Sequence, residues 1–242
     1  MKNQIVSLYD YTGESLRPWA KMGYECFAYD IQNPKRIEPY PWNGVSYRYA
    51  DLYDMGTLLR LFEQHNNKVV FMSAFPPCTD LSAAGARWWK DKAKIDPAFQ
   101  INAAKHVKTA ALMGMAWHVP FYIENPIGAL TRLWRKPDHK FDPYEYGGYL
   151  PTDDAHPDWP QYIPPRDAYR KRTCLWTGGS FRMPTKRPVD YVNLTYKRTD
   201  PTKGQNFNPQ TGKLGGKSLR TKNIRSATPR GFARAVCEAN AA

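Results

Sequence analysis

The sequence predicts an α/β protein whose mostly parallel sheet is covered by helices on both faces, with a small basic insertion. Two short apolar runs, residues 4–9 and 68–74, are bounded by turn-forming residues, which is typical of strands buried on both faces. Segments with helical spacing of apolar residues lie between such runs, as in βαβ units. A length of 242 residues with 42% hydrophobic content suits one such domain with an insertion.

Four cysteines, Cys26, Cys78, Cys174 and Cys237, are scattered without a C-x-x-C pair or a histidine at metal-ligand spacing. This pattern argues against structural zinc and a disulfide framework, and for a reducing compartment. The N-terminus leads directly into a strand pattern, and no apolar run approaches the length of a membrane span. We therefore expect a soluble cytoplasmic protein without a metal.

Positive charge is concentrated near the C-terminus. Residues 181–234 contain 13 of the 35 Lys and Arg residues but only two of the 22 Asp and Glu residues. A basic segment attached to a nearly neutral domain indicates a polyanionic partner, most simply nucleic acid. Interleaved Tyr191, Tyr196 and Phe207, with several glycines, suit a surface that follows a phosphate backbone. A solvated tail is the alternative.

The first predicted strand, residues 4–9, leads into a turn at 10–15, and a helix is predicted to begin at Ser15. The next predicted strand, residues 24–30, ends on Asp30. A glycine turn lets the backbone approach a ligand, and an acid at the next strand end can bind ribose hydroxyls. Since the phosphate-cradling G-x-G-x-x-G is absent, the pattern favours a nucleoside-like ligand over a dinucleotide. Gly13 as an ordinary turn glycine remains the alternative.

A third predicted strand, residues 45–52, carries Asp51 near its end, where the carboxylate can accept a hydrogen bond from an amino group such as that of adenine. Asp51 as the N-cap of the helix predicted at 55–62 is the alternative. A long helix at 101–117 is predicted to pack on the sheet. The lone histidines His106 and His118 on or near it are interpreted as structural.

Cys78 lies where the predicted strand 68–74 gives way to the polar stretch 75–82, FPPCTDLS. The carboxyl end of a central parallel strand faces the ligand crevice in open α/β sheets. The two prolines stiffen the exit and withhold two N–H donors, so the thiol is presented rather than packed. These features predict a nucleophile, whereas a buried structural cysteine is the usual alternative.

The segment after this cysteine, residues 83–92, is predicted to be a loop that closes over nucleic acid, because it mixes small, aromatic and basic residues. Arg87, Lys90 or Lys92 would lie near phosphates. Trp88 and Trp89 are adjacent, so at least one of them is expected to be partly exposed.

A further predicted strand, residues 121–123, delivers Glu124, Asn125 and Pro126 at its carboxyl end. Cys78 and Glu124 are therefore predicted to lie on one rim of the sheet. A carboxyl group in apolar surroundings can stay protonated or share a proton with a ring nitrogen. Glu124 as a helix cap is the alternative.

Four segments, in this order along the chain, resemble motifs of the DNA cytosine-5 methyltransferase family. Residues 75–85, FPPCTDLSAAG, are similar to the nucleophile motif P-C-Q-x-F/L-S-x-x-G, and residues 124–126, ENP, to the E-N-V motif. Residues 169–176 resemble the Q-x-R-x-R strand, and residues 225–230 the R-x-L-T-x-R motif. The resemblance covers residues 5–178 and 225–237 and is greatest to compact phage-encoded members.

The resemblance implies a Rossmann-like, S-adenosylmethionine-dependent methyltransferase fold. Residues 1–180, completed by 225–242, would form the catalytic domain, and residues 181–224 a short basic target-recognition region. The implied activity is methyl transfer from S-adenosylmethionine to C5 of cytosine in double-stranded DNA, in a bacterial or phage-infected cell. The cytosine would be flipped out of the duplex before Cys78 adds to its C6 atom.

The resemblance also assigns residues to three roles. Glu124 would donate to or share a proton with N3, and Arg172 with Arg170 would hold the cytosine O2 and the thiol region. The implied catalytic set is Cys78, Glu124, Asn125, Arg170 and Arg172. The implied cofactor-binding set is Tyr11, Thr12, Gly13, Ser15, Leu16, Asp30, Ile31, Asp51, Leu52, Phe75 and Pro76. The implied DNA-binding set is Ser82, Arg87, Trp88, Lys90, Lys197, Arg198, Lys213, Lys217, Arg220, Lys222 and Arg225.

The sequence departs from the family pattern in several places. Ser15 stands where the family has a second glycine, and Ala168 replaces the Gln of Q-x-R-x-R. About forty residues separate the arginine strand from Arg225, which favours short or lax target recognition. The sequence stops at Ala242 before the family's G-N-x-V motif, so another segment, a second subunit or a looser cofactor site is expected to compensate. An RNA cytosine-5 methyltransferase, a non-catalytic nucleic-acid-binding relative and a donor carrying a larger group remain alternatives.

Overall fold

The computed structural model describes residues 3–35, 40–191, 214 and 218–241. Within these ranges the strands form one eight-stranded sheet in the order β3-β4-β2-β1-β5-β6-β8-β7. Their bounds are β1 Gln4–Leu8, β2 Glu25–Asp30, β3 Tyr40–Trp42, β4 Val45–Tyr49, β5 Val69–Ala74, β6 Phe121–Pro126, β7 His139–Phe141 and β8 Thr173–Gly178.

The five strands β4, β2, β1, β5 and β6 are parallel, whereas β8 pairs antiparallel with both β6 and β7. Strand order reverses between β1 and β5, which makes this point of the sheet a topological switch, where ligands bind outside the carboxyl ends of the strands. The topology is that of a Rossmann-like, mostly parallel sheet with helices on both faces, and the predicted α/β fold class is confirmed.

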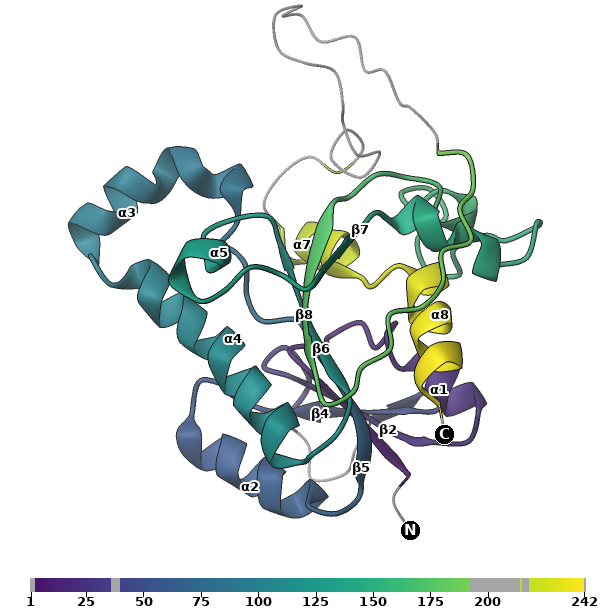
Figure 1. Ribbon diagram of the computed structural model, residues 1–242, viewed down its shortest axis with the longest axis horizontal. Coiled ribbons are helices and arrows are strands. Elements are labelled where there is room, and N and C mark those ends of the chain that lie inside the picture. Colours follow the sequence, from purple (N-terminus) through teal and green to yellow (C-terminus); the bar gives the residue numbers. More distant parts are fainter. Residues whose placement is uncertain (1–2, 36–39, 192–213, 215–217, 242) are drawn as a thin grey trace, which may run out of the picture.

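Helices cover both faces of the sheet (Figure 1). On one face lie α2 and α4, and on the other lie α1 and α8. The α-helices are α1 Arg17–Lys21, α2 Met55–His65, α3 Trp89–Ile95, α4 Phe99–Ala116, α5 Leu130–Leu133, α7 Leu219–Ser226 and α8 Arg230–Asn240. The short 3₁₀ helices are η1 Ala83–Trp88, η2 Pro143–Tyr149 and η3 Pro165–Asp167.

Alternation along each strand divides the core into two layers. In β6, Phe121 and Ile123 pack toward α4, whereas Tyr122 packs toward α8. In β8, Trp176 lies in the α4 layer and Leu175 in the α8 layer. Side chains buried on both faces explain why these strands are continuous apolar runs in the sequence.

The C-terminal helix α8 completes the second layer. Its buried Phe232 stacks on Phe141 of β7 with ring centroids 4.0 Å apart and meets Tyr146 of η2 edge-on at 5.1 Å. Residues 225–241 therefore pack on the same sheet as the N-terminal part of the chain. The start of the basic region is also held there, since the Arg187 amide donates to the Glu145 carbonyl at 2.9 Å.

Several predicted details differ from the structure. Asp54, not Asp51, caps α2, because its carboxylate accepts the Thr57 amide at 2.7 Å. The segment predicted as a loop at 83–92 forms η1 and the start of α3, which projects from the body of the protein (Figure 1). Glu124 to Pro126 lie inside β6 rather than beyond it, because the antiparallel β8 extends the pairing.

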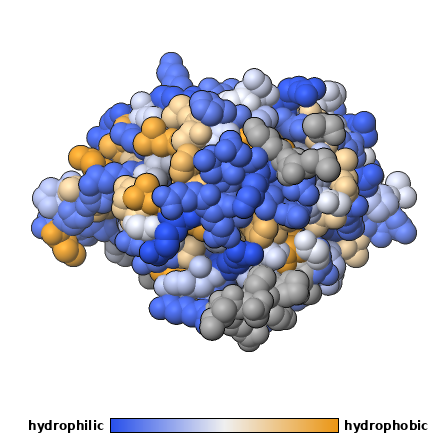
Figure 2. Space-filling view, turned by 90° about the horizontal axis from the view of Figure 1, so that it is seen from below, coloured by the Kyte–Doolittle hydropathy of each residue, from blue (hydrophilic) through white to orange (hydrophobic). Residues whose placement is uncertain are grey.

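The surface seen from below in Figure 2 is largely hydrophilic at its centre, with hydrophobic residues in small scattered groups. Such scattered groups are normal on a solvent-facing surface. None of the helices in the described part of the chain is long and apolar enough to cross a membrane.

Candidate functional site at the carboxyl edge of the sheet

The turn after β1 is built around the buried carboxylate of Asp10. Its Oδ1 accepts hydrogen bonds from the Gly13 amide at 2.7 Å and the Thr12 hydroxyl at 3.3 Å. Its Oδ2 accepts from the hydroxyls of Ser7 at 2.8 Å and Ser15 at 2.7 Å. Because four donors converge on one carboxylate, the turn is held in shape by the protein itself.

Gly13 is the tightest position in this turn. Its φ of +64° lies in the left-handed region, and a Cβ atom there would overlap the Tyr47 hydroxyl. That hydroxyl donates to the Thr12 carbonyl at 3.0 Å. Backbone conformation and available space therefore both require glycine, so the single glycine of the sequence pattern is more than a general turn former.

The acids predicted to bind a cofactor lie at two neighbouring strand ends. Asp30 ends β2, where its carboxylate accepts the Gln32 amide at 2.8 Å and burial raises its pKa. Asp51 follows β4 and accepts the Tyr53 amide at 3.0 Å. Since β4, β2 and β1 are adjacent and parallel, both acids lie on the same edge as the Asp10 turn.

The apolar members of the predicted cofactor set divide into two groups. Ile31 and Tyr11 are exposed, with 51% and 41% of their surface accessible. Leu16 and Leu52 are buried in the core, so only their backbone groups are available to a ligand. Leu52 already uses its carbonyl to accept the Tyr9 hydroxyl at 3.2 Å.

Cys78 lies in the loop after β5. Its carbonyl accepts hydrogen bonds from the amides of Leu81 at 3.0 Å and Ser82 at 2.8 Å, which folds the loop into a turn. Of the four cysteines, all in the described part of the chain, only Cys78 is exposed. The other three, at positions 26, 174 and 237, are buried.

The loop that carries Cys78 is fastened to β6 and the segment after it. Asn125 donates from Nδ2 to the Pro76 carbonyl at 2.9 Å, and the Ala129 amide donates to the Leu81 carbonyl at 2.8 Å. A side chain at Gly128 would overlap that same Leu81 carbonyl. Asn125 therefore positions the double-proline exit, and its buried Oδ1 has no hydrogen-bond partner among the described residues.

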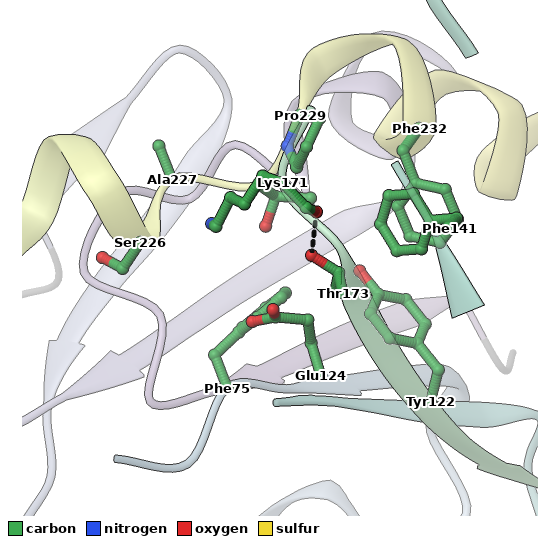
Figure 3. Close-up of a pocket in the computed structure, with 11 residues that line it drawn as sticks. Phe75, Tyr122, Glu124, Phe141, Lys171, Thr173, Ser226, Ala227, Pro229 and Phe232 are labelled. Carbon is green, nitrogen blue, oxygen red and sulfur yellow. Dashed lines mark hydrogen bonds between the residues drawn. The ribbon is translucent and has the colours of Figure 1, made fainter. Parts of the chain in front are cut away.

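The side chain of Glu124 lines a small, mostly apolar recess between the sheet and the segment that joins α7 to α8 (Figure 3). We call it the Glu124 recess. It encloses about 240 Å³ including its open mouth. Its lining residues are Phe75, Tyr122, Glu124, Phe141, Lys171, Thr173, Ser226, Ala227, Thr228, Pro229 and Phe232. Phe75, assigned from the sequence to cofactor binding, thus lies beside Glu124.

The electrostatics of the Glu124 recess connect three side chains. Burial raises the pKa of the Glu124 carboxyl, and the nearby Lys171 ammonium partly opposes this rise. Although Cys78 is exposed as a residue, the surrounding protein partly desolvates its thiol and raises the thiol pKa, and the charge of Glu124 adds to the effect. Lys171 and, to a smaller extent, Arg225 lower the pKa of the thiol. Glu124 therefore lies close enough to Cys78 for its charge to act on the thiol.

The two arginines assigned to the cytosine O2 and the thiol do not line this recess. Arg172 forms an ion pair with Asp142, with 2.9 Å between Nη2 and Oδ2. Arg170 places its guanidinium 5.4 Å from the centroid of the Tyr191 ring. Their assignment to the cytosine O2 and the thiol region stays a prediction, and Lys171 between them is the residue of this segment that lines the recess and acts on Glu124 and Cys78.

The residues predicted to bind DNA are partly described. Arg87 stacks over the Trp88 ring at 5.1 Å, and Trp88 is 52% exposed, as predicted for one of the tryptophan pair. Ser82 accepts the Ala84 amide at 3.3 Å, and Lys90 is exposed on α3. Exposed side chains on α7 are Arg220, Lys222 and Arg225. The remaining four, Lys197, Arg198, Lys213 and Lys217, lie outside the described residues.

Sequence reasoning missed two residues that shape the site. Asp10 was named only as part of a turn, although an Asp three residues before a turn glycine is typical of a side chain that accepts the glycine amide. Lys171 was passed over in favour of its arginine neighbours. Period-two alternation from Leu175 through Thr173 would have placed Lys171 on the α8 face of the sheet, where Glu124 also lies.

No cluster of three or more metal-ligating side chains occurs in the described ranges. The sequence matches no protein-family model and has no significant match among curated proteins. Among solved structures, one match is an E. coli prophage-encoded chain named "putative DNA modification methyltransferase", with 12% identity and a TM-score of 0.40. The match covers 73% of this chain and 46% of that one, and a TM-score this low does not transfer an activity.

Proposed function

We propose that this protein is an S-adenosylmethionine-dependent DNA cytosine-5 methyltransferase. The observation that carries the proposal is the pair formed by Cys78 and Glu124. An exposed cysteine follows β5, and a carboxyl group with raised pKa lies in the adjacent parallel strand β6, where its charge acts on the thiol. A nucleophile beside a proton donor is the requirement for activating a cytosine ring.

The residues at the other end of the carboxyl edge fit the cofactor. The turn after β1 presents the exposed Tyr11 beside the buried Gly13, and Asp30 and Asp51 supply carboxylates at the next two strand ends. These residues, with the exposed Ile31, would hold the nucleoside part of S-adenosylmethionine. When bound, the cofactor supplies an electrophilic methyl group.

In the proposed reaction, one negative charge moves between the side chains of Cys78 and Glu124. The Cys78 thiolate forms a bond from sulfur to C6 of cytosine, and the Glu124 carboxyl gives its proton to N3. The negative charge thus passes from sulfur to the Glu124 carboxylate, and C5 becomes nucleophilic. Once the ring carries the methyl group, loss of the C5 proton to a base and departure of Cys78 as thiolate would restore the ring's conjugation, and the N3 proton would return to the Glu124 carboxylate.

The target carbon is hidden inside a duplex, so the base must leave the helical stack at a cost of a few kcal/mol. The exposed Arg87–Trp88 pair follows the Cys78 loop directly, and α7 presents basic side chains at the other side of the Glu124 recess. Stacking and phosphate contacts from these two segments would offset the cost of flipping.

The test is covalent trapping. Purified protein is incubated with S-adenosylmethionine and duplex DNA containing 5-fluorocytosine, which blocks loss of the C5 substituent and preserves the sulfur–C6 adduct. We expect a denaturant-resistant complex with the wild type and none with Cys78→Ser. Mass analysis of nucleosides from ordinary DNA then reports the group transferred, and base-resolution mapping reports the sequence context.

Duplex DNA without cytosine and a transfer RNA serve as substrate controls, and thermal unfolding shows that Cys78→Ser is folded. A complex formed only with the RNA would favour the RNA cytosine-5 alternative. Salt-sensitive DNA binding without any adduct would overturn the proposed reaction and favour a non-catalytic binding protein.

A further inference from the structure

The three basic residues 170–172 directly precede β8, and each of their side chains contacts a different part of the protein. Arg172 is paired with Asp142 at 2.9 Å, and Arg170 lies over the Tyr191 ring. Lys171 lines the Glu124 recess. Alternation along the strand explains the division, since Lys171 continues the row of Thr173 on the face that carries Glu124.

Lys171 is held in place over the recess. Its Nζ donates a hydrogen bond of 2.7 Å to the Arg225 carbonyl near the end of α7. Figure 3 shows its side chain passing above Glu124 toward Ser226 and Ala227. The tether joins the strand β8 to the α7–α8 segment, so the ammonium group is fixed by backbone on the far side of the recess.

The surroundings strengthen the effect of this charge. Phe75, Phe141 and Phe232 line the same recess and exclude water from part of it. Electrostatic interactions are stronger where the surroundings are apolar than in bulk water. Among the described residues, no hydrogen bond is formed to the Glu124 carboxylate, so the field of Lys171 is its main favourable electrostatic interaction.

The charged groups that face the reactive pair come from three elements. Glu124 of β6 and Lys171 before β8 act on the Cys78 thiol, and Arg225 of α7 adds a weaker positive contribution. Lys171 is also the cation that acts on Glu124. Cys174, next along β8 on the opposite face, is influenced by Lys140, Glu124 and Arg172.

We infer that Lys171, rather than Arg172 or Arg170, is the positioning residue whose cation stabilises the Cys78 thiolate and then the Glu124 carboxylate. The inference rests on the proposed function for its role in catalysis. The reaction moves one negative charge from sulfur to the Glu124 carboxyl group while a proton passes to the base. A single ammonium group that acts on both sites stabilises the state before the transfer and the state after it.

The test uses the thiol of the free protein and needs neither DNA nor cofactor. The rate of Cys78 alkylation by iodoacetamide is measured against pH, with the modified site identified by mass analysis. We expect Lys171→Met to move the alkylation profile upward by about one pH unit, because a neighbouring opposite charge changes an ionisation equilibrium by roughly that amount or more. Lys171→Arg should keep the wild-type profile, and the matched surface change Lys108→Met should have no effect.

Lys171→Gln separates charge from tethering, because an amide can still donate to the Arg225 carbonyl but carries no charge. It should shift the profile as Lys171→Met does, while thermal unfolding shows whether each variant is folded. A wild-type profile for both folded neutral variants would overturn the inference, as would an equal or larger shift in Arg172→Met. Failure of the proposed reaction can be told apart from failure of this inference. If the proposed reaction is wrong, the wild type forms no covalent complex with 5-fluorocytosine DNA, whatever its alkylation profile.

Discussion

Two regions at the carboxyl edge of the sheet each contain a buried glutamate, and the two glutamates have different partners. In the turn after β1, Glu14 is paired with Arg17 at 3.1 Å, and the neighbouring Asp10 accepts four hydrogen bonds. In the Glu124 recess, the described residues donate no hydrogen bond to Glu124, and Lys171 acts on it only through its charge. Both carboxyl groups have a raised pKa because they are buried.

The difference separates a binding element from a reactive one. A turn whose central carboxylate, Asp10, accepts four hydrogen bonds within the protein is preorganised and changes little when a ligand arrives. A buried carboxyl group without hydrogen-bond partners retains its capacity to bond a substrate and to release a proton. The contrast predicts that changes in the recess affect the reaction, whereas changes in the turn affect folding and cofactor binding.

The largest expected effect is a slower methyl transfer in the Glu124→Gln variant. The amide keeps the size of the side chain but has no proton to give to N3, so the single-turnover rate should fall by about 10²- to 10⁴-fold. Because burial raises the pKa of Glu124, the wild-type rate should also decline as alkaline pH removes that proton. The variant should lack this decline.

Glu63→Gln on the exposed surface of α2 is the matched control and should leave the rate unchanged. Thermal unfolding of Glu124→Gln should differ little from wild type, because the amide keeps the size and shape of the carboxyl group. A rate within a few fold of wild type would contradict the assignment of Glu124 as proton donor, whatever the trapping experiment shows for Cys78.

The second largest expected effect is lower stability and weaker cofactor binding in the Asp10→Asn variant. One carboxylate oxygen becomes an NH₂ group, which faces donors instead of accepting from them. Loss of charge-assisted hydrogen bonds in a buried site should lower the free energy of unfolding by about 3 kcal/mol and weaken S-adenosylmethionine binding. Urea unfolding and calorimetric titration measure the two. Exposed Asp153→Asn is the control, and an unchanged unfolding midpoint in Asp10→Asn would show that the turn is not held by this network.

These two regions also differ in how far the sequence predicts them. The parallel strands β1, β2, β4, β5 and β6 could be predicted, because apolar runs, turn residues and strand-end acids are local signals, whereas the short edge strands β3 and β7 were not predicted. Placing Cys78 and Glu124 on one edge followed from the parallel adjacency of β5 and β6, which the structure confirms. The cofactor and DNA roles assigned to individual side chains stay predictions.

What could not be predicted depends on contacts distant in the chain. Lys171 is set apart from its arginine neighbours by Arg225 and Glu124, which lie far from it in the sequence. The cap of α2 is, by contrast, a local feature: the helix begins at Met55, as predicted, and Asp54 directly before it is the N-cap. The family resemblance directed attention to the arginines, and the alternation of β8 favours the lysine between them.

The smallest expected effect concerns Glu14 and the pH dependence of stability. Burial raises the pKa of Glu14 to about 8, although Arg17 opposes the rise. The folded state thus holds this proton more tightly than the unfolded chain. The stabilising contribution is complete below the ordinary pKa of 4.5 and is lost as pH rises through about 8.

One such proton changes the free energy of unfolding by at most about 1.4 kcal/mol per pH unit. Glu14→Gln should therefore lose less stability than wild type between about pH 5 and pH 8, as measured by urea unfolding at several pH values. Glu63→Gln again provides the exposed comparison and should follow the wild-type slope. Equal slopes in Glu14→Gln and wild type would mean that the Arg17 pair keeps Glu14 charged, and the turn would then hold an ion pair where the recess holds a carboxyl group with raised pKa.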